Sequence, residues 1–316
     1  QLPGTTDKQR AIDLSPILAS AATRNEFTPY CSEERNPPFD TGRLNREILE
    51  ACENAIKTPE DWSGHFGIQN FDRSVGAMLS GAVARAHGRG GLPTGRLRVN
   101  LTGTAGQSLG CWNAPGVALH LEGDANDYVG KGMSGGRIVL TTTAVDRASA
   151  RRNVICGNAC LYGATGGELF ANGQAGERFA VRNSGANAVI EGAGHHACEY
   201  MTGGTVVIMG PVGPNLAAGM TGGELFFLDQ SGLTERFLNP EFVEATRLED
   251  QAFNAPERRL KDLVARHVNL TGSEWGKRVL DTWEMMLPHW VYIAPKNLTA
   301  SDEISQQDVP LRLVKA

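Results

Sequence analysis

The sequence has 316 residues, 41% of them hydrophobic and 21% charged, which is typical of a soluble globular protein with room for more than one domain. A formal net charge of −5 and the lack of a long basic run argue against a nucleic-acid partner. No apolar run reaches the roughly 18 residues of a membrane span, and the opening QLPGTTDKQR is not a signal peptide, so no membrane partner is predicted. The start at Gln1 instead of methionine suggests a processed or trimmed piece.

Cysteine usage points to a reducing compartment. The chain has six cysteines and no C-x-x-C pair, so neither a zinc ribbon nor a thioredoxin-type site is indicated. Cys156 and Cys160 lie in a strand-and-turn context and are predicted to be buried thiols that act as small hydrophobes. This pattern predicts a cytoplasmic protein.

Residues 1–95 are predicted to form a lead-in segment of loops and helices. The stretch LNREILEACENAI places its apolar residues on one helical face. The stretch DRSVGAMLSGAVARAHG does so more strongly, with Asp72 as a candidate N-terminal cap and Gly88 at the end.

Residues 96–232 hold most of the 38 glycines, alternating with short apolar and β-branched runs. Each unit presents a turn followed by a strand of about five residues. Four of the five steps between successive unit starts are 18 or 19 residues, and the longer step contains the polar AVDRASARRN, which is interpreted as an inserted loop. The unit starts are Gly116, Gly135, Gly166, Ser184, Gly203 and Gly222.

This period predicts a parallel β-helix. A meander of hairpins would need two-residue turns with Asn-Gly or Asp-Gly signals, which are scarce here. Coils stacked about 4.8 Å apart leave no room for Cβ atoms at tight corners, so glycine recurs there. We therefore expect Gly116, Gly135, Gly166, Gly203 and Gly222 to be structural corner glycines, several with positive φ, and the helical flanks to cover the open ends of the stack.

The stretch NDYVGKGMSGGRIVL contains Gly130, Gly132 and Gly135 in the spacing G-x-G-x-x-G, with Lys131 among them. A dinucleotide fingerprint needs a strand before the first glycine and a helix after the last. Here the polar GDANDY precedes the glycines and the strand-like RIVLTTT follows them. The glycines are therefore predicted to be structural.

Two other clusters have chemical potential. His195, His196, Cys198 and Glu199 form one short window in which a metal site is conceivable, because alternate residues of a strand share a face. The window falls at a coil corner without further ligands nearby, so a corner role is favoured. Asp124 and Asp127 would suit acid–base chemistry, but turn and backbone hydrogen bonds between coils are favoured.

Residues 233–316 are predicted to form a helical C-terminal tail. Pro256 suits a first helical turn, and Ser273 is a candidate cap for a further helix that stops before Pro288. Trp275, Trp283 and Trp290 recur at spacings of eight and seven residues, which favours a packing face over a ligand box.

Long motifs carry a family resemblance. The stretches GTAGQSLGCWNAPGVALHLEGDANDYVGKGMSGGRIVL, GNACLYGATGGELFANGQAGERF and NLAAGMTGGELFFLDQ closely resemble the C-terminal glycine-repeat domain of the glutamate synthase large (alpha) subunit. IQNFDRSVGAMLSGAVARAHGRGG is similar to the segment that leads into it, and LTGSEWGKRVLDTWEMMLPHWVYIAPK to the helical tail. The resemblance covers roughly residues 40–295.

The resemblance implies a right-handed parallel β-helix that supports other domains and carries no catalytic group. In that family, a glutaminase with an N-terminal cysteine nucleophile releases ammonia, which reacts with 2-oxoglutarate. The product is reduced at FMN with electrons relayed by an iron–sulfur cluster. This chain starts at Gln1, has Cys31 as its first cysteine, and lacks a closely spaced cysteine trio. It is therefore predicted to hold no catalytic, cofactor or metal site, with FMN and the iron–sulfur cluster in partner domains.

The predicted function is a non-catalytic structural subunit or domain of a glutamate-synthase-type complex. Its predicted partners are the glutaminase and an FMN-barrel synthase, as chains or as domains. The same glycine-repeat domain also occurs in N-methylglutamate synthase-type assemblies and in one subunit of formylmethanofuran dehydrogenase, so a related amidotransferase stays open. A stand-alone β-helix enzyme is a further alternative, disfavoured because no carboxylate recurs in register on successive coils.

Overall fold

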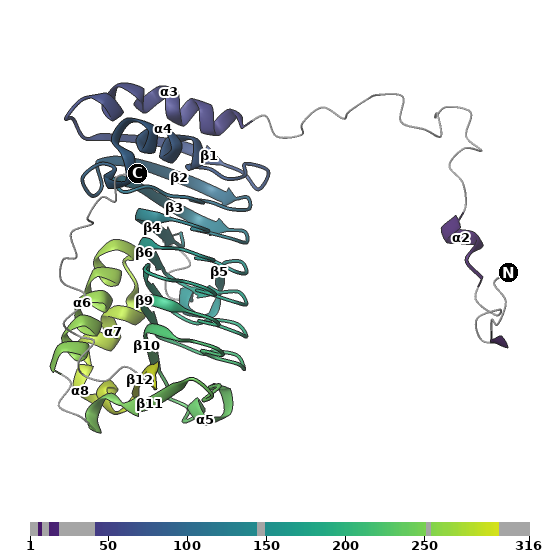
Figure 1. Ribbon diagram of the computed structural model, residues 1–316, viewed down its shortest axis with the longest axis vertical. Coiled ribbons are helices and arrows are strands. Elements are labelled where there is room, and N and C mark those ends of the chain that lie inside the picture. The colour runs from purple at the N-terminus through teal and green to yellow at the C-terminus, as the bar shows by residue number, and fades with distance from the viewer. Residues whose placement is uncertain (1–5, 8–12, 19–41, 144–148, 251–253, 297–316) are drawn as a thin grey trace, which may run out of the picture. The chain divides into compact units, whose positions relative to one another are not determined.

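The computed structural model describes residues 6–7, 13–18, 42–143, 149–250 and 254–296 (Figure 1). The chain divides into two compact units, residues 1–41 and 42–316. The first unit contains the short helix α2 (Ser15–Leu18). Every other element described below lies in the second unit. No described helix combines the length and the apolar composition that a membrane span requires.

One 12-stranded sheet organises the second unit, in the order β1-β2-β3-β4-β6-β8-β9-β10-β12-β11, with β5 and β7 beside this path. Its strands pair in parallel except where β12 meets β10 and β11. The sheet is open, with β1 and β11 at its edges. The strands are β1 (Trp62–Ile68), β2 (Leu97–Ala105), β3 (Val117–Ala125), β4 (Ser134–Thr141), β5 (Val154–Cys156), β6 (Gly166–Ala171), β7 (Gln174–Ala175), β8 (Asn187–Ile190), β9 (Thr202–Ile208), β10 (Gly222–Leu228), β11 (Val243–Arg247) and β12 (Trp290–Pro295).

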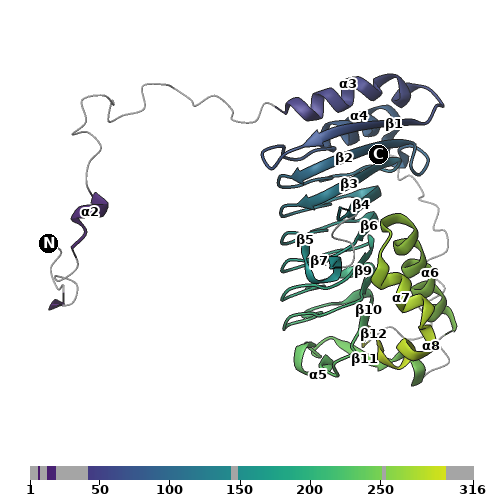
Figure 2. The ribbon, with the colours of Figure 1, turned by 180° about the vertical axis from the view of Figure 1, so that it is seen from behind.

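Helices flank this sheet at two places (Figures 1 and 2). Two lie beside the β1 edge, and the C-terminal ones lie against one face of the sheet from β4 toward β10. The α-helices are α3 (Arg43–Lys57), α4 (Ala77–His87), α5 (Thr234–Phe237), α6 (Asn254–Thr271), α7 (Glu274–Asp281) and α8 (Trp283–Met286). The 3-10 helices are η2 (Gly88–Gly90), η3 (Ala150–Arg152), η4 (Leu248–Asp250) and η5 (Leu287–His289).

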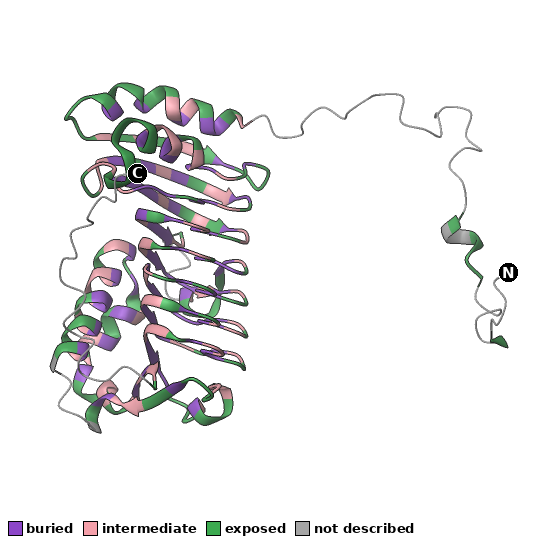
Figure 3. Ribbon diagram, viewed as in Figure 1, coloured by how far each residue is buried: buried purple, intermediate pink, exposed green. Residues whose placement is uncertain are grey.

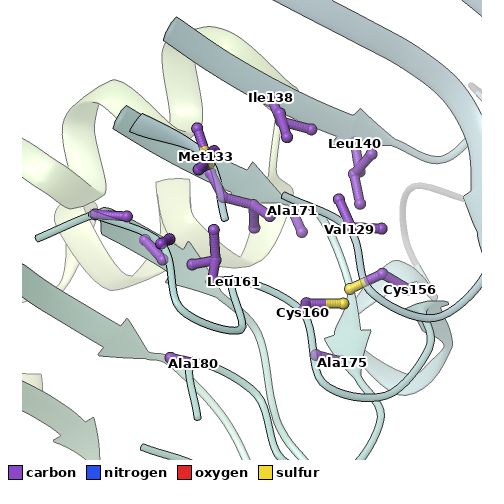
Figure 4. Close-up of a cluster of buried hydrophobic side chains, with 14 of the residues drawn as sticks. Val129, Met133, Ile138, Leu140, Cys156, Cys160, Leu161, Ala171, Ala175 and Ala180 are labelled. Atoms are coloured by element: carbon purple, nitrogen blue, oxygen red, sulfur yellow. The ribbon is translucent and has the colours of Figure 1, made fainter. Parts of the chain in front are cut away.

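The two faces of the strands contribute side chains to two separate hydrophobic cores. Alternate residues of a strand point to opposite faces. One face packs against the turns that follow the strands, and Figure 4 shows part of this core around Met133, Ile138 and Leu161. The other face, including Phe170, packs under the C-terminal helices. Figure 3 shows the strands buried along most of their length where these helices cover them.

The turns that follow the strands repeat one backbone conformation. In six successive turns, φ is positive at three alternate residues. The middle amide donates to the preceding turn, as in Gly130 N to Leu109 O at 2.9 Å, and outer amides donate to the following turn, as in Gly132 N to Tyr162 O at 2.8 Å. A non-glycine residue in the left-handed backbone conformation lowers the stability of the fold by about 1 kcal/mol or more, and the hydrogen bonds between turns offset that loss. The positions are 108, 110, 112; 128, 130, 132; 159, 161, 163; 178, 180, 182; 196, 198, 200; and 215, 217, 219.

The structure confirms a mainly β chain with helical flanks and parallel pairing of successive strands. The helical segments predicted around 44–56 and 256–271 are confirmed, and Ser273 caps α7 by accepting a hydrogen bond from Gly276 N at 2.8 Å. Asp72 is not a helix cap. It accepts from Gln69 N at 2.9 Å, and α4 begins five residues later, after Gly76 with φ of 95°.

The flanking segments also supply strands that the sequence analysis missed. β1 extends the sheet at one edge, and β11 and β12 extend it at the other. The stretch WSGHFGI of β1 contains two glycines, which weaken a strand signal, and its place is set by parallel pairing with β2.

The glycines predicted to be corners lie where neighbouring parallel strands approach closely. Gly135, Gly166, Gly203 and Gly222 each lie two residues before mutually aligned strand residues, and Gly185 takes this position where Ser184 was expected. The expected positive φ is found at Gly116, with 92°, but not at Gly135, Gly166, Gly203 or Gly222. There it falls on the next glycine, as at Gly204 with 86°. A Cβ atom on Gly203 would overlap the carbonyl oxygen of Ser184 in the preceding coil.

Replacing Gly203 with alanine should therefore lower the free energy of unfolding by about 2 kcal/mol or more, because its methyl group cannot be placed without separating two coils. Gly67→Ala in β1 is the matched control, since nothing lies within 4 Å of a Cβ there and its φ is not positive. We expect that control to change stability by less than about 0.5 kcal/mol. Urea denaturation followed by circular dichroism measures both, and equal effects would contradict the crowding argument.

Candidate functional site

The G-x-G-x-x-G loop does not form a phosphate cradle. Gly130 and Gly132 occupy two of the positive-φ positions of the turn between β3 and β4, with φ of 66° and 63°. Their amides donate to Leu109 O and Tyr162 O in neighbouring turns, at 2.9 and 2.8 Å. No helix N-terminus follows, because β4 begins at Ser134. Backbone donors that a phosphate would need are therefore already used within the fold.

The histidine–cysteine window does not converge on a metal site. His196 and Cys198 lie in a turn and not in a strand, both with positive φ. Cys198 is fully buried in the inner core, and burial raises the pKa of its thiol far above the usual value. His196 Nδ1 instead lies 3.4 Å from Glu199 Oε1. Within the described residues, no group of three or more His, Cys, Asp and Glu side chains is arranged to hold a metal ion.

The two aspartates are used to join coils. Asp124 Oδ1 accepts from Thr104 Oγ1 at 2.9 Å across β2 and β3. Asp127 Oδ1 accepts from the amide of Asn158 in the next coil at 2.7 Å, and Asn158 Oδ1 in turn accepts from the amide of Glu177 at 2.8 Å. These carboxylates accept hydrogen bonds that join neighbouring strands and turns, and they do not form an acid–base pair.

Cys156 and Cys160 are buried, with sulfur atoms that point toward one another inside the inner core (Figure 4). The hydrogen bond to Cys160 and burial together raise the pKa of Cys156 well above the usual value. Thiols in such surroundings are poor nucleophiles and poor metal ligands. Both residues therefore behave as small hydrophobic side chains, as the sequence predicts.

The three tryptophans pack between the C-terminal helices and the sheet. The rings of Trp283 and Trp290 lie 6.2 Å apart, and Trp283 Nε1 donates to Glu257 Oε1 at 2.9 Å. Trp275 Nε1 donates to Met209 O at 2.7 Å, and the Arg151 guanidinium lies 4.4 Å from the centre of its ring.

A buried polar network, which the sequence analysis missed, fastens these helices to the sheet. Glu191 directly follows β8, and its Oε1 lies 3.1 Å from His267 Nε2 of α6 and accepts a short hydrogen bond from Ser273 Oγ at the start of α7. All three side chains are buried. The residue types suggest a serine–histidine–glutamate triad, but Ser273 donates to Glu191, caps α7 and is closed off from solvent. This network is therefore structural.

Exposed aromatic residues gather instead on the outside of the stacked turns. Trp112 and Tyr200 are 63% and 54% exposed, both at the third positive-φ position of their turns. Lys131 Nζ lies 5.0 Å from the ring centre of Tyr128 and 5.8 Å from that of Tyr162, which joins neighbouring turns. Large exposed aromatic groups with a cation among them are typical of protein-binding surfaces. We name this surface the aromatic ridge; it consists of Trp112, Tyr128, Lys131, Tyr162 and Tyr200.

Removing the carboxylate at the centre of the buried network should be costly. We expect Glu191→Ala to lower the free energy of unfolding by about 3 kcal/mol, because it leaves His267 and the Ser273 hydroxyl buried without their acceptor. Glu53→Ala is the control: its exposed ion pair with Lys57 at 2.7 Å should contribute less than about 0.5 kcal/mol. A thermal or urea transition measures both, and a neutral Glu191→Ala would show that the network does not hold the helices.

Comparisons with known proteins identify the family to which the chain is related. The model of the GXGXG motif family matches residues 45–296. Over 231 residues, 73% of this chain, the sequence is 51% identical to ferredoxin-dependent glutamate synthase 2 of Synechocystis. It is 42% identical to the NADH glutamate synthase of Schizosaccharomyces pombe over 93% of the chain, and 39% identical to the NADPH glutamate synthase large chain of Bacillus subtilis over 92%.

The match covers only part of each relative. The chain spans 15% of the Synechocystis protein, 14% of the Schizosaccharomyces protein and 19% of the Bacillus protein. Within that span the match includes the glycine-containing turns, whose amides and positive-φ positions are described above. The chain therefore belongs to the GXGXG motif family, and its similarity lies with the motif-bearing region of glutamate synthases.

Proposed function

We propose that this chain is the non-catalytic structural part of a glutamate-synthase-type complex, which forms glutamate from glutamine, 2-oxoglutarate and a reductant. One observation carries the proposal: Asp124, Asp127 and Cys198 are committed to hydrogen bonds or burial within the fold, whereas the aromatic ridge is exposed. The names of the relatives supply the reaction class. The chain matches less than a fifth of each, and the chemistry is proposed to lie in the remainder of such a protein.

The finer fold belongs to the same proposal. We infer that strands and turns alternate around a right-handed parallel β-helix that spans residues 96–232, with 1–95 as lead-in segment and 233–316 as tail. The hydrogen bonds between successive turns support this inference. They repeat from one turn to the next alongside the parallel strand pairs, so the turns would form a second wall of the β-helix beside the sheet. Such a stack is a rigid rod on which larger domains can be positioned.

The proposed partners are an N-terminal-cysteine glutaminase and an FMN-barrel synthase with an iron–sulfur cluster. The residues described here do not fit such a cluster: the described cysteines are buried in the core, and no trio of them is brought together. FMN and the cluster are proposed to belong to the partner parts. Free buried thiols support a reducing compartment, for which the cytoplasm is proposed.

The isolated chain should neither bind FMN nor hydrolyse glutamine. Glutamine-dependent glutamate formation should appear when the chain is co-expressed with the glutaminase and FMN-barrel parts of a synthase, in a complex that shows a flavin spectrum. Flavin absorbance of the purified chain and a glutaminase assay provide the direct measurements. Turnover of a substrate by the chain alone would overturn the proposal.

The aromatic ridge should be the contact surface. We expect the double variant Trp112→Ser, Tyr200→Ser to lose stable association with those partner parts, since exposed aromatic anchors dominate interface energies. Its thermal unfolding should stay unchanged. Met285→Ser is the control, because Met285 is 72% exposed on α8 and outside the ridge. Co-purification and size-exclusion chromatography measure association, and full assembly by the double variant would place the interface elsewhere.

A further inference from the structure

A cavity of about 440 Å³ lies at the carboxyl ends of three parallel strands. Glu191, Met209 and Asp229 directly follow β8, β9 and β10, and all three line it. Its volume falls in the range of small-molecule sites, and ligands of parallel sheets commonly bind beyond the carboxyl ends of the strands. Apolar side chains make up much of its wall, among them Phe227 and Phe237.

Glu191 brings a half-satisfied carboxylate to this cavity. Its side chain is 1% exposed, and its Oε1 is occupied by His267 and Ser273, neither of which lines the cavity. Its Oε2 has no hydrogen-bond partner. Glu191 lines the cavity, and Oε2 is its only carboxylate oxygen without a hydrogen-bond donor. A buried carboxylate oxygen without a donor is unfavourable, so a ligand that carries an N–H donor would be stabilised there.

The second acidic residue of the cavity is already satisfied. Asp229 Oδ1 accepts from Leu233 N at 3.0 Å, and its Oδ2 accepts from Thr234 N at 2.9 Å and lies 3.6 Å from Arg247. Glu191 Oε2 is therefore the acceptor that a positively charged group entering the cavity would meet.

Two arginines on the same lining offer the opposite charge. The Arg151 guanidinium stacks on Trp275, and Gln174 Nε2 donates to Arg151 O at 2.8 Å, which fixes the backbone of η3 beside the cavity. Arg151 and Arg152 are both exposed, and neither forms an ion pair with another described residue. Guanidinium groups in this state are suited to a carboxylate, which they bind through paired N–H donors.

We propose that this cavity binds a free α-amino acid with an aliphatic side chain. The ammonium group donates to Glu191 Oε2, the carboxylate accepts from Arg151 and Arg152, and the side chain lies against the apolar wall. A zwitterion carries both charges that this arrangement would bind: its ammonium group would meet the buried carboxylate, and its carboxylate would meet the exposed arginines. This inference is independent of the scaffold proposal, since it requires no partner chain.

Ligand analogues on the unaltered 316-residue chain provide the first test. Isothermal titration calorimetry should detect saturable binding of L-leucine with a Kd of about 1 mM or below. 3-Methylbutan-1-amine lacks the carboxylate and 4-methylpentanoate lacks the ammonium group, and each should bind at least about tenfold more weakly. No saturable binding of leucine up to about 10 mM, or equal binding of all three compounds, would overturn the proposal.

Variants provide the second test. Glu191→Gln keeps an acceptor for Ser273 and His267 but removes the charge, and Arg152→Ala removes one cation; each should weaken leucine binding at least about tenfold. Arg89→Ala, an exposed arginine outside the cavity, should leave it unchanged. Unchanged binding by both cavity variants contradicts the proposal. If Glu191→Gln does not fold, leucine binding by Arg152→Ala and the analogue series still test the proposal.

Discussion

The close spacing of successive parallel strands, and of the turns that follow them, is the constraint on which the other features depend. Neighbouring strands lie about 4.8 Å apart, and every residue at a tight corner must fit within that spacing. Gly203 shows the consequence, because any Cβ there would overlap the backbone of the coil before it. The alternate positive-φ residues of the turns follow from the same requirement, since this conformation turns their amides toward the neighbouring coil. Residues as unlike as Trp112, Arg178 and Cys198 accept the left-handed conformation for this reason.

The two faces of the strands then take different roles. Inside the stack, small and branched apolar side chains fill the space between strands and turns. On the other face, Val139, Phe170, Val189, Val207 and Phe226 are paired strand by strand and continue to Tyr292 of β12. Toward β1 the same row is polar, with His120, Asn100 and His65. Burial and the neighbouring arginines lower the pKa of His120 to about 4, so it stays neutral at physiological pH. The helices cover the apolar part of the row.

Attachment of those helices combines apolar contact with a few charged contacts. Glu168 pairs with Arg137 of β4 at 2.9 Å and with Arg266 of α6, which ties the helix to two neighbouring strands. Next to Arg266, His267 contacts Glu191 in the interior, and Glu191 also accepts a hydrogen bond from Ser273 at the start of α7. Only one carboxylate oxygen of Glu191 bonds to the helices. The same residue lines the neighbouring cavity, and its other oxygen has no donor.

The sequence by itself determined the repeating part of this protein. Glycine spacing of 18 or 19 residues specifies parallel strands in register, since each repeating unit pairs with its neighbours and the pattern within one unit is sufficient. Ser273 as a cap and the apolar face of α3 are equally local. Tertiary structure decided the rest. Glu191 meets partners 76 and 82 residues away, β1 is recognisable only from its pairing with β2, and the cavity forms where a strand end, an inserted loop and a helix converge. Side-chain contacts at such separations leave no periodic signal, because they depend on how separate elements pack and not on the spacing of residues along the chain.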